Sequence, residues 1–127
     1  MRIDPNIVAI LRSWFPALDL DGVRVVVRGP VCWFVRNVLR QGAMTVAPFI
    51  FFGRDAYDPK EHSSVALLAH ELKHVDQYRR YGYVAFFARY FWALGKNRFR
   101  YSRDLPLEAE AYALQAEVRD KLRGTNL

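Results

Sequence analysis

VALLAHELKHVDQ, residues 65–77, is the stretch of sequence that decides the fold. Apolar residues surround the turn before His70, so this helix is expected to enter the interior of the protein. Residues four apart lie on one face of a helix, and His70 and His74 can therefore direct both imidazoles at one ion. Glu71 lies about 100° round the helix from His70, where it can take a proton from a water molecule without binding the ion. The pattern predicts a zinc site at His70 and His74, with Glu71 as the catalytic base.

The third protein ligand of a catalytic zinc ion has to come from elsewhere in the chain. His62, the only other histidine, lies about two turns before His70. The segment LPLEAEAY, residues 105–112, opens a second helix whose packing against the first would bring Glu108 or Glu110 to the ion. Residues two apart on a helix point about 200° away from each other, so one turn cannot aim both glutamates at the same place. Without a metal, the histidines are ordinary core or surface side chains, and the glutamates are acids favoured in the first turn of a helix.

These residues resemble the gluzincins, zinc peptidases with HExxH on one helix and a glutamate on a later one. The later motif usually reads E-x-x-A followed by Asp or Asn, and residues 108–112, EAEAY, match it with Glu108 as the metal ligand. Tyr112 departs from the motif, because an acid or an amide would normally orient the first histidine from that position. The resemblance implies a zinc-dependent metallopeptidase, a hydrolase that binds its metal through His70, His74 and Glu108.

A closer resemblance covers roughly residues 43–112. The series AMTVAPFIFF, DAYDP, LLAHELKHVDQYRRYG and LPLEAEAY is similar to a small zincin-like domain, the extracellular contractile injection system (eCIS) core domain. The first forty residues add nothing to this resemblance. It implies a zincin-like fold with HExxH on the central helix and, as in gluzincins, a strand edge that holds a substrate peptide in extended form. Segment 43–52 takes the place of that strand.

The rest of the chain predicts an α+β fold, with a short sheet beside a helical core, in a single domain over residues 1–127. Of the 127 residues 52% are hydrophobic, which is enough to bury a core, and no internal repeat or linker divides the chain. Strands are expected at 23–27 and 43–52, and Pro48 requires an edge position or a bulge in the second. Residues 31–40 fit either a strand or a short helix.

The expected helices are recognised by the residues at their ends. Asp4 is a good N-cap for the first, Ser63 or Ser64 for the central one, and Gly82 is a plausible C-cap of the central helix. These signals predict helices at 4–15, 63–81, 83–94 and 104–123.

Cys32 is the only cysteine, which excludes an intramolecular disulfide and an all-cysteine metal site and fits a reducing compartment. The N-terminus, MRIDPNIVAI, has neither the basic nor the apolar region of a signal peptide. No apolar run reaches the roughly 18–20 residues that span a bilayer. We therefore expect a cytoplasmic protein without a transmembrane segment.

The net charge of +6 is unevenly spread, because residues 79–103 contain seven basic residues and no acidic one. The segment 78–101 interleaves basic with aromatic residues, which suits a protein partner, an anionic membrane or nucleic acid. In the helix expected at 83–94, Val84, Phe91 and Trp92 point away from the main apolar stripe, and this predicts an exposed docking surface. The alternative is that the N-terminal helix covers them.

Two functions are compatible with these residues. The first is hydrolysis of peptide bonds, in which Glu71 activates a water molecule and Tyr112 or Tyr101 steadies the oxyanion. The second is a catalytically silent zincin scaffold that binds a partner through segment 78–101. Glu71 favours the enzyme, because a purely structural metal site has no use for that carboxylate.

Overall fold

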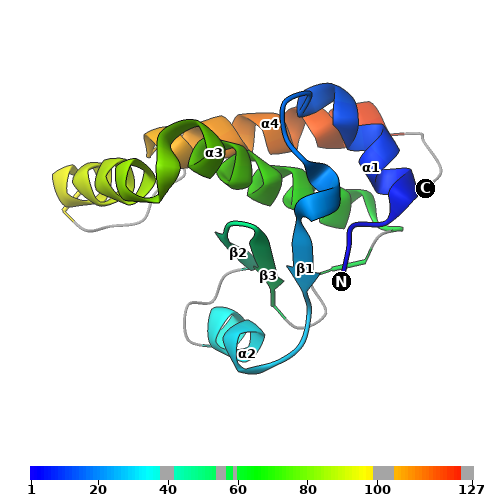
Figure 1. Ribbon diagram of the computed structural model, residues 1–127, viewed down its shortest axis with the longest axis horizontal. Coiled ribbons are helices and arrows are strands. Elements are labelled where there is room, and N and C mark those ends of the chain that lie inside the picture. The colour runs from blue at the N-terminus through cyan, green and yellow to red at the C-terminus, as the bar shows by residue number, and fades with distance from the viewer. Residues whose placement is uncertain (38–41, 54–56, 59, 99–104, 124–127) are drawn as a thin grey trace.

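The computed structural model describes residues 1–37, 42–53, 57–58, 60–98 and 105–123 (Figure 1). These residues form the predicted α+β fold, with four α-helices and one three-stranded sheet. The two longest helices, α3 (His62–Lys96) and α4 (Pro106–Leu122), lie side by side along the molecule (Figure 1). Within the described residues, no helix is both long and apolar enough to cross a membrane.

The sheet lies on one side of this helix pair, and α2 (Pro30–Asn37) lies at the far side of the sheet (Figure 1). Its strands are β1 (Arg24–Val26), β2 (Ala43–Val46) and β3 (Phe49–Phe52), in the order β1-β3-β2. The central strand, β3, runs parallel to β1 and antiparallel to β2. In this sheet β2 is therefore an edge strand, and it contacts α3.

The expectation of one continuous strand over residues 43–52 was wrong. The segment is a hairpin in which Val46 pairs with Phe49, and Ala47 and Pro48 form the turn, joined by a cis peptide bond. Proline has no N–H to donate to the ladder, so the strand ends there and the chain turns back. The expected edge strand is β2 alone, and Pro48 lies neither at an edge nor in a bulge.

The helix α1 (Pro5–Leu11) begins as predicted, because the Asp4 carboxylate accepts a hydrogen bond from the backbone N–H of Asn6. A short 3-10 turn, Arg12–Trp14, follows it, and a second, Leu20–Gly22, precedes β1. Residues 30–37 are helical, which decides between the two alternatives for 31–40; residues 38–40 lie outside the described part of the chain.

The cap predicted for the central helix was also wrong. The helix α3 starts at His62, and its N-cap residue, Glu61, makes no side-chain capping hydrogen bond. Ser64 lies inside the first turn, where its hydroxyl accepts a hydrogen bond from the backbone N–H of Asp58. Asp104, expected at the start of the last helix, lies outside the described residues, and α4 begins at Pro106.

Gly82 divides α3 into two halves. Its backbone angles, φ 77° and ψ 166°, are open to glycine and strained for other residues. Helical backbone resumes after it and continues to Lys96, so Gly82 separates two helical halves at a kink, which confirms the break predicted between residues 81 and 83. The first half is largely buried, and its apolar side chains pack with those of the sheet, α1 and the far end of α4, in a core that includes Leu11, Ile50, Phe52, Val65, Leu68, Leu72 and Val118.

Candidate metal centre

His70 and His74 lie one turn apart on the buried half of α3, and Glu108 lies in the first turn of α4. Nε2 of His74 is 2.5 Å from Oε1 of Glu108, and Nε2 of His70 is 3.8 Å from Oε2 of the same carboxylate. All three side chains are buried, and their ligand atoms lie within 4.8 Å of one another. Two helices thus bring together the three side chains expected to bind the metal.

Glu110 faces basic side chains of α3 and not the histidines, as expected for a residue two positions after Glu108. Its Oε1 lies 3.2 Å from Nζ of Lys73 and 2.5 Å from Nη2 of Arg80, both on α3. Burial raises the pKa of Glu110, but the hydrogen bond and charge of Lys73, together with the charge of Arg80, leave the pKa below its usual value. Geometry therefore selects Glu108 of the two glutamates. His62, at the first residue of α3, is not part of the His–His–Glu cluster.

Gln77 connects the two helices at this site. Its side chain is fully buried, its Oε1 lies 2.9 Å from Nδ1 of His74, and its Nε2 donates a 3.0 Å hydrogen bond to the carbonyl oxygen of Leu107. Because the amide N–H₂ is directed at Leu107, the amide oxygen accepts a hydrogen bond from the protonated Nδ1 of His74. The bond fixes the tautomer that leaves Nε2 of His74 free to bind a metal, and it holds the residue next to Glu108.

His70 has different surroundings. Its Nδ1 is buried and has no hydrogen-bond partner among the described residues. The ring of Tyr112 packs edge-on against the imidazole, with 4.4 Å between the ring centroids and 72° between the planes. Tyr112 thus contacts the first histidine from the position at which gluzincins usually carry an acid or an amide.

The donor atoms suit a metal ion, because two imidazole nitrogens and one carboxylate oxygen form a common zinc ligand set. A buried carboxylate needs a compensating positive charge. Burial lowers the pKa of His74, but the hydrogen bond to Glu108 and the charges of Glu71 and Glu108 outweigh it, so the pKa is raised. A proton on His74 and a metal ion compensate the same carboxylate, so binding of one disfavours the other.

Glu71 lies beside this cluster and is held by the edge strand. The hydroxyl of Thr45, on β2, donates a 2.5 Å hydrogen bond to Oε2 of Glu71, and both side chains are buried. The hydroxyl of Tyr78 donates in turn to the carbonyl oxygen of Thr45 at 3.2 Å. The expected catalytic base therefore has a fixed position, and Thr45 engages one of its two oxygens.

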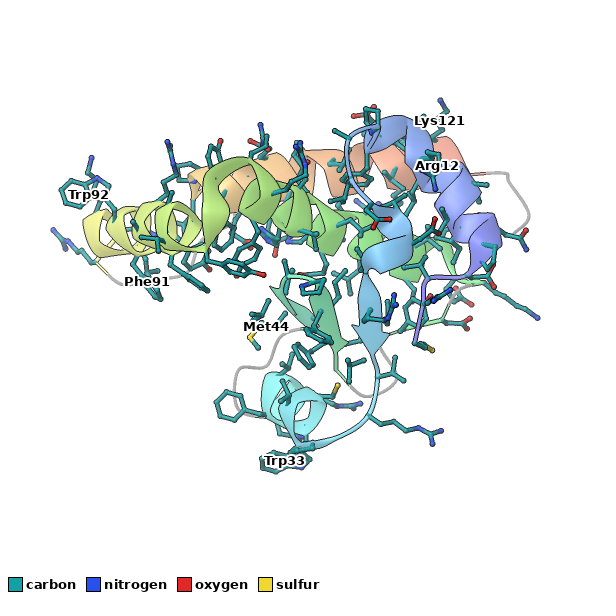
Figure 2. The ribbon with its side chains drawn as sticks, viewed as in Figure 1. Arg12, Trp33, Met44, Phe91, Trp92 and Lys121 are labelled. Atoms are coloured by element: carbon teal, nitrogen blue, oxygen red, sulfur yellow. The ribbon has the colours of Figure 1, made fainter. Side chains whose placement is uncertain are left out.

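A cavity of about 390 Å³ opens over the metal cluster and Glu71. The strand β2 lines one side and α3 the other, and Figure 2 labels one lining residue of each, Met44 and Phe91. The part of α3 that lines the cavity beyond His74 is aromatic, with Tyr78, Phe86, Phe87, Tyr90 and Phe91. The edge strand, Glu71 and the His–His–Glu cluster therefore border one cavity.

Besides Tyr78, whose hydroxyl donates to the carbonyl oxygen of Thr45, two tyrosines line this cavity. One is Tyr112, a residue expected from the sequence to steady the oxyanion, whereas Tyr101, the other candidate, lies outside the described residues. Tyr90, which the sequence did not single out as a site residue, lines it too. Burial, with smaller contributions from Glu108, Tyr112 and Glu71, raises the pKa of Tyr90 to about 12, so its phenol stays protonated at neutral pH.

Gln77 and Thr45 were also missed by reasoning from the sequence. Gln77 carried a usable signal, because it follows His74 by three residues and therefore shares its face of the helix. A glutamine on a buried helical face needs hydrogen-bond partners, and a neighbouring imidazole is one. Thr45 carried no signal, since its contact with Glu71 depends on how the hairpin packs against α3.

The chain was compared with known families and proteins. It matches the family described as the eCIS core domain over residues 2–82. No curated protein and no solved structure gives a significant match. The matched region starts earlier than the resemblance over 43–112 suggested, includes His70, Glu71 and His74, and ends at the Gly82 kink, before Glu108. Because the match covers more than half of its 127 residues, the chain belongs to the eCIS core domain family.

Proposed function

We propose that this protein is a zinc-dependent metallopeptidase of the gluzincin type, with zinc bound by His70, His74 and Glu108. The observation that carries the proposal is the position of Glu71. Its carboxylate is buried next to the three ligands, where a structural metal site needs no further acid, and Thr45 holds it in place. A positioned carboxylate beside an activated water molecule suits general base catalysis.

Zinc bound there would polarise the scissile carbonyl and acidify a water molecule. The side chains provide the proton transfer. Thr45 occupies Oε2 of Glu71, so Oε1 accepts the proton of the water molecule and later returns it to the leaving amine. Gln77 keeps the proton of His74 on Nδ1, which directs the lone pair of Nε2 at the metal.

The cavity favours an extended peptide as substrate. Since β2 is an edge strand that lines the cavity, its outer edge can pair with the backbone of a bound peptide. The aromatic side of the cavity suits an apolar substrate side chain next to the cleaved bond. Tyr112 and Tyr90 are the described groups that can donate a hydrogen bond to the oxyanion.

The alternative is a catalytically silent scaffold that works through segment 78–101. Exposed aromatic and basic residues on the second half of α3 support it, and residues 99–101 of the segment lie outside the described chain. The cavity and this segment share side chains, since five aromatic residues of the segment also line the cavity: Tyr78, Phe86, Phe87, Tyr90 and Phe91. Only the peptidase requires Glu71.

In the test, zinc-loaded wild type and Glu71→Gln are each incubated with a mixture of unstructured peptides, and the cleavage products are measured by mass spectrometry. We expect Glu71→Gln to keep its zinc and its thermal stability but to lose hydrolysis, with the loss in kcat rather than KM. Glu110→Gln is the matched control, because it alters an acid outside the metal cluster. Equal cleavage by wild type and Glu71→Gln contradicts the proposed base, and absence of cleavage by zinc-loaded wild type favours the silent scaffold.

A further inference from the structure

The second half of α3, Tyr83–Lys96, extends beyond the rest of the molecule (Figure 1). Its large apolar side chains are exposed, with 86% of Val84, 58% of Phe91 and 69% of Trp92 accessible to solvent. Figure 2 shows Phe91 and Trp92 near the free end of this helix, far from Arg12 at the end of α1. The N-terminal helix therefore does not cover these residues, and the alternative considered from the sequence was wrong.

The exposed apolar residues share one side of the helix. At about 100° per residue, they fall within an arc of about 140°, which we call the apolar face: Val84, Phe87, Ala88, Phe91 and Trp92. Arg89 and Lys96 follow within about 60° of Trp92, and Nζ of Lys96 lies 5.1 Å from the centroid of the Trp92 ring. The segment is thus an amphipathic helix with an uncharged face and a basic flank.

The positive charge beside the apolar face has no acidic partner among the residues that the structure describes. Residues 77–103 contain no acid, so the helix has no negative side chain of its own. Arg79 and Arg80, before the kink, form ion pairs with Asp76, and Arg80 also pairs with Glu110. Beyond the kink, Arg89, Lys96 and Arg98 form no ion pair with any acidic side chain of the described chain. The surface therefore combines apolar area with free positive charge.

We propose that the apolar face docks on an anionic lipid membrane, with the helix lying in the plane of the interface. Aromatic and aliphatic side chains would enter the region between headgroups and acyl chains, while Arg89 and Lys96 meet the headgroup phosphates. A helix of this length spans about 21 Å, so it lies on the bilayer and does not cross it. The inference does not depend on catalysis.

The composition of the face argues against the other occupants. A second copy of the chain would bring like charges together, because the flank is basic and contains no acid. Nucleic acid needs cations and stacking rings on the same surface, whereas here the centre of the face is Val84 and Ala88 and the cations lie at one side. A lipid surface satisfies both the uncharged centre and the basic flank.

Docking would also determine where the cavity lies relative to the membrane. Phe87 and Phe91 belong to the apolar face and also line the cavity over Glu71. The opening of the cavity would therefore lie close to the lipid surface.

The test is co-sedimentation of the full chain with vesicles of phosphatidylcholine alone or with about one quarter phosphatidylglycerol. We expect binding to the anionic vesicles at least tenfold tighter than to the neutral ones, weakened by 0.5 M NaCl (roughly a 3–4 Å screening length). The double variant Phe91→Ala/Trp92→Ala should lose at least tenfold in affinity, and Arg89→Gln/Lys96→Gln should lose the preference for anionic lipid. Circular dichroism checks that each variant keeps its helix content.

Trp33→Ala is the matched control, because Trp33 lies on α2, away from the free end of α3 (Figure 2), and is 62% exposed. It should bind as the wild type does. The proposal is overturned by absence of binding to anionic vesicles, by unchanged binding of Phe91→Ala/Trp92→Ala, or by an equal loss in Trp33→Ala. A dimer in sedimentation velocity that Phe91→Ala/Trp92→Ala abolishes assigns the face to self-association and also overturns it, as does equally tight, equally sensitive binding to single-stranded DNA.

Discussion

Glu108 of α4 places one carboxylate oxygen 2.5 Å from Nε2 of His74 on α3, although the two residues are far apart in sequence. The contact depends on the packing of two helices, and only the α3 side lies in the region that matches the eCIS core domain family. Gln77 secures the packing through the carbonyl oxygen of Leu107. The metal centre is therefore assembled from a part of the chain that the family match covers and a part that it does not.

Removal of Glu108 should empty the site. We expect wild type to bind about one zinc ion per chain and Glu108→Ala to bind it at least 10–100-fold more weakly, because a ligand is lost. Glu110→Ala, two residues further along, should keep the metal and lose less than about 1 kcal/mol of stability, since its ion pairs are partly exposed. Zinc titration against a chromophoric chelator distinguishes the two, and the reverse pattern would mean that Glu110 is the ligand.

Gln77→Leu should weaken both the fold and the metal site. The variant leaves Nδ1 of His74 and the carbonyl oxygen of Leu107 without their partner, which we expect to cost about 2–4 kcal/mol in urea unfolding. Zinc affinity should fall about 10–100-fold because the imidazole is no longer oriented. Gln77→Glu keeps the hydrogen-bond acceptor and loses the donor, so its zinc affinity should lie between those of wild type and Gln77→Leu. A zinc affinity of Gln77→Leu equal to that of wild type would mean that Gln77 does not support the metal site.

The His–His–Glu cluster could be predicted because the spacing of its histidines is a local property of a helix. His70 and His74 share a face wherever α3 lies, and the motif at 108–112 selected Glu108 before any contact was known. The partners of Glu71 and His74 were not predicted, because Thr45 and Leu107 approach only after the hairpin and α4 have packed against α3.

The wrong prediction of a single strand over residues 43–52 has a physical reason. AMTVAPFIFF is apolar at every position except Thr45, so its pattern does not distinguish one strand from two, and it gives no clear signal for the turn at Ala47 and Pro48. The break between the helices predicted at 63–81 and 83–94 is confirmed at Gly82, because glycine readily adopts the positive φ that interrupts a helix.

Thr45→Val tests how Glu71 is positioned. The substitution keeps the shape of the side chain but removes the hydroxyl that donates to Oε2 of Glu71. A hydrogen bond to a charged group contributes about 1.5–3 kcal/mol, so we expect kcat to fall at least tenfold if the whole effect reaches the transition state. KM and zinc content should stay close to wild type. A kcat equal to that of wild type means that Glu71 holds its position without Thr45.

Tyr90 predicts a change of stability in alkaline solution. Its pKa of about 12 in the folded protein lies above the ordinary value of 10.0, so the folded state holds the proton more strongly than the unfolded state does. The stability that this provides is complete below pH 10 and is lost as the pH rises through about 12. In metal-free protein, the unfolding free energy of Tyr90→Phe should therefore fall less over this range, by about 1–2 kcal/mol, which is below the full difference between the two pKa values because the side chain is partly exposed to solvent. Parallel curves for wild type and Tyr90→Phe would contradict the shift.

The kink at Gly82 divides the lining of the cavity along the chain. The histidines and Glu71 lie before the kink, whereas Phe86, Phe87, Tyr90 and Phe91, which line one side of the cavity, lie after it. A side chain at position 82 would strain the backbone, because residues other than glycine rarely adopt its φ of 77°. The placement of the aromatic residues over the candidate metal cluster therefore depends on a single residue that has no side chain.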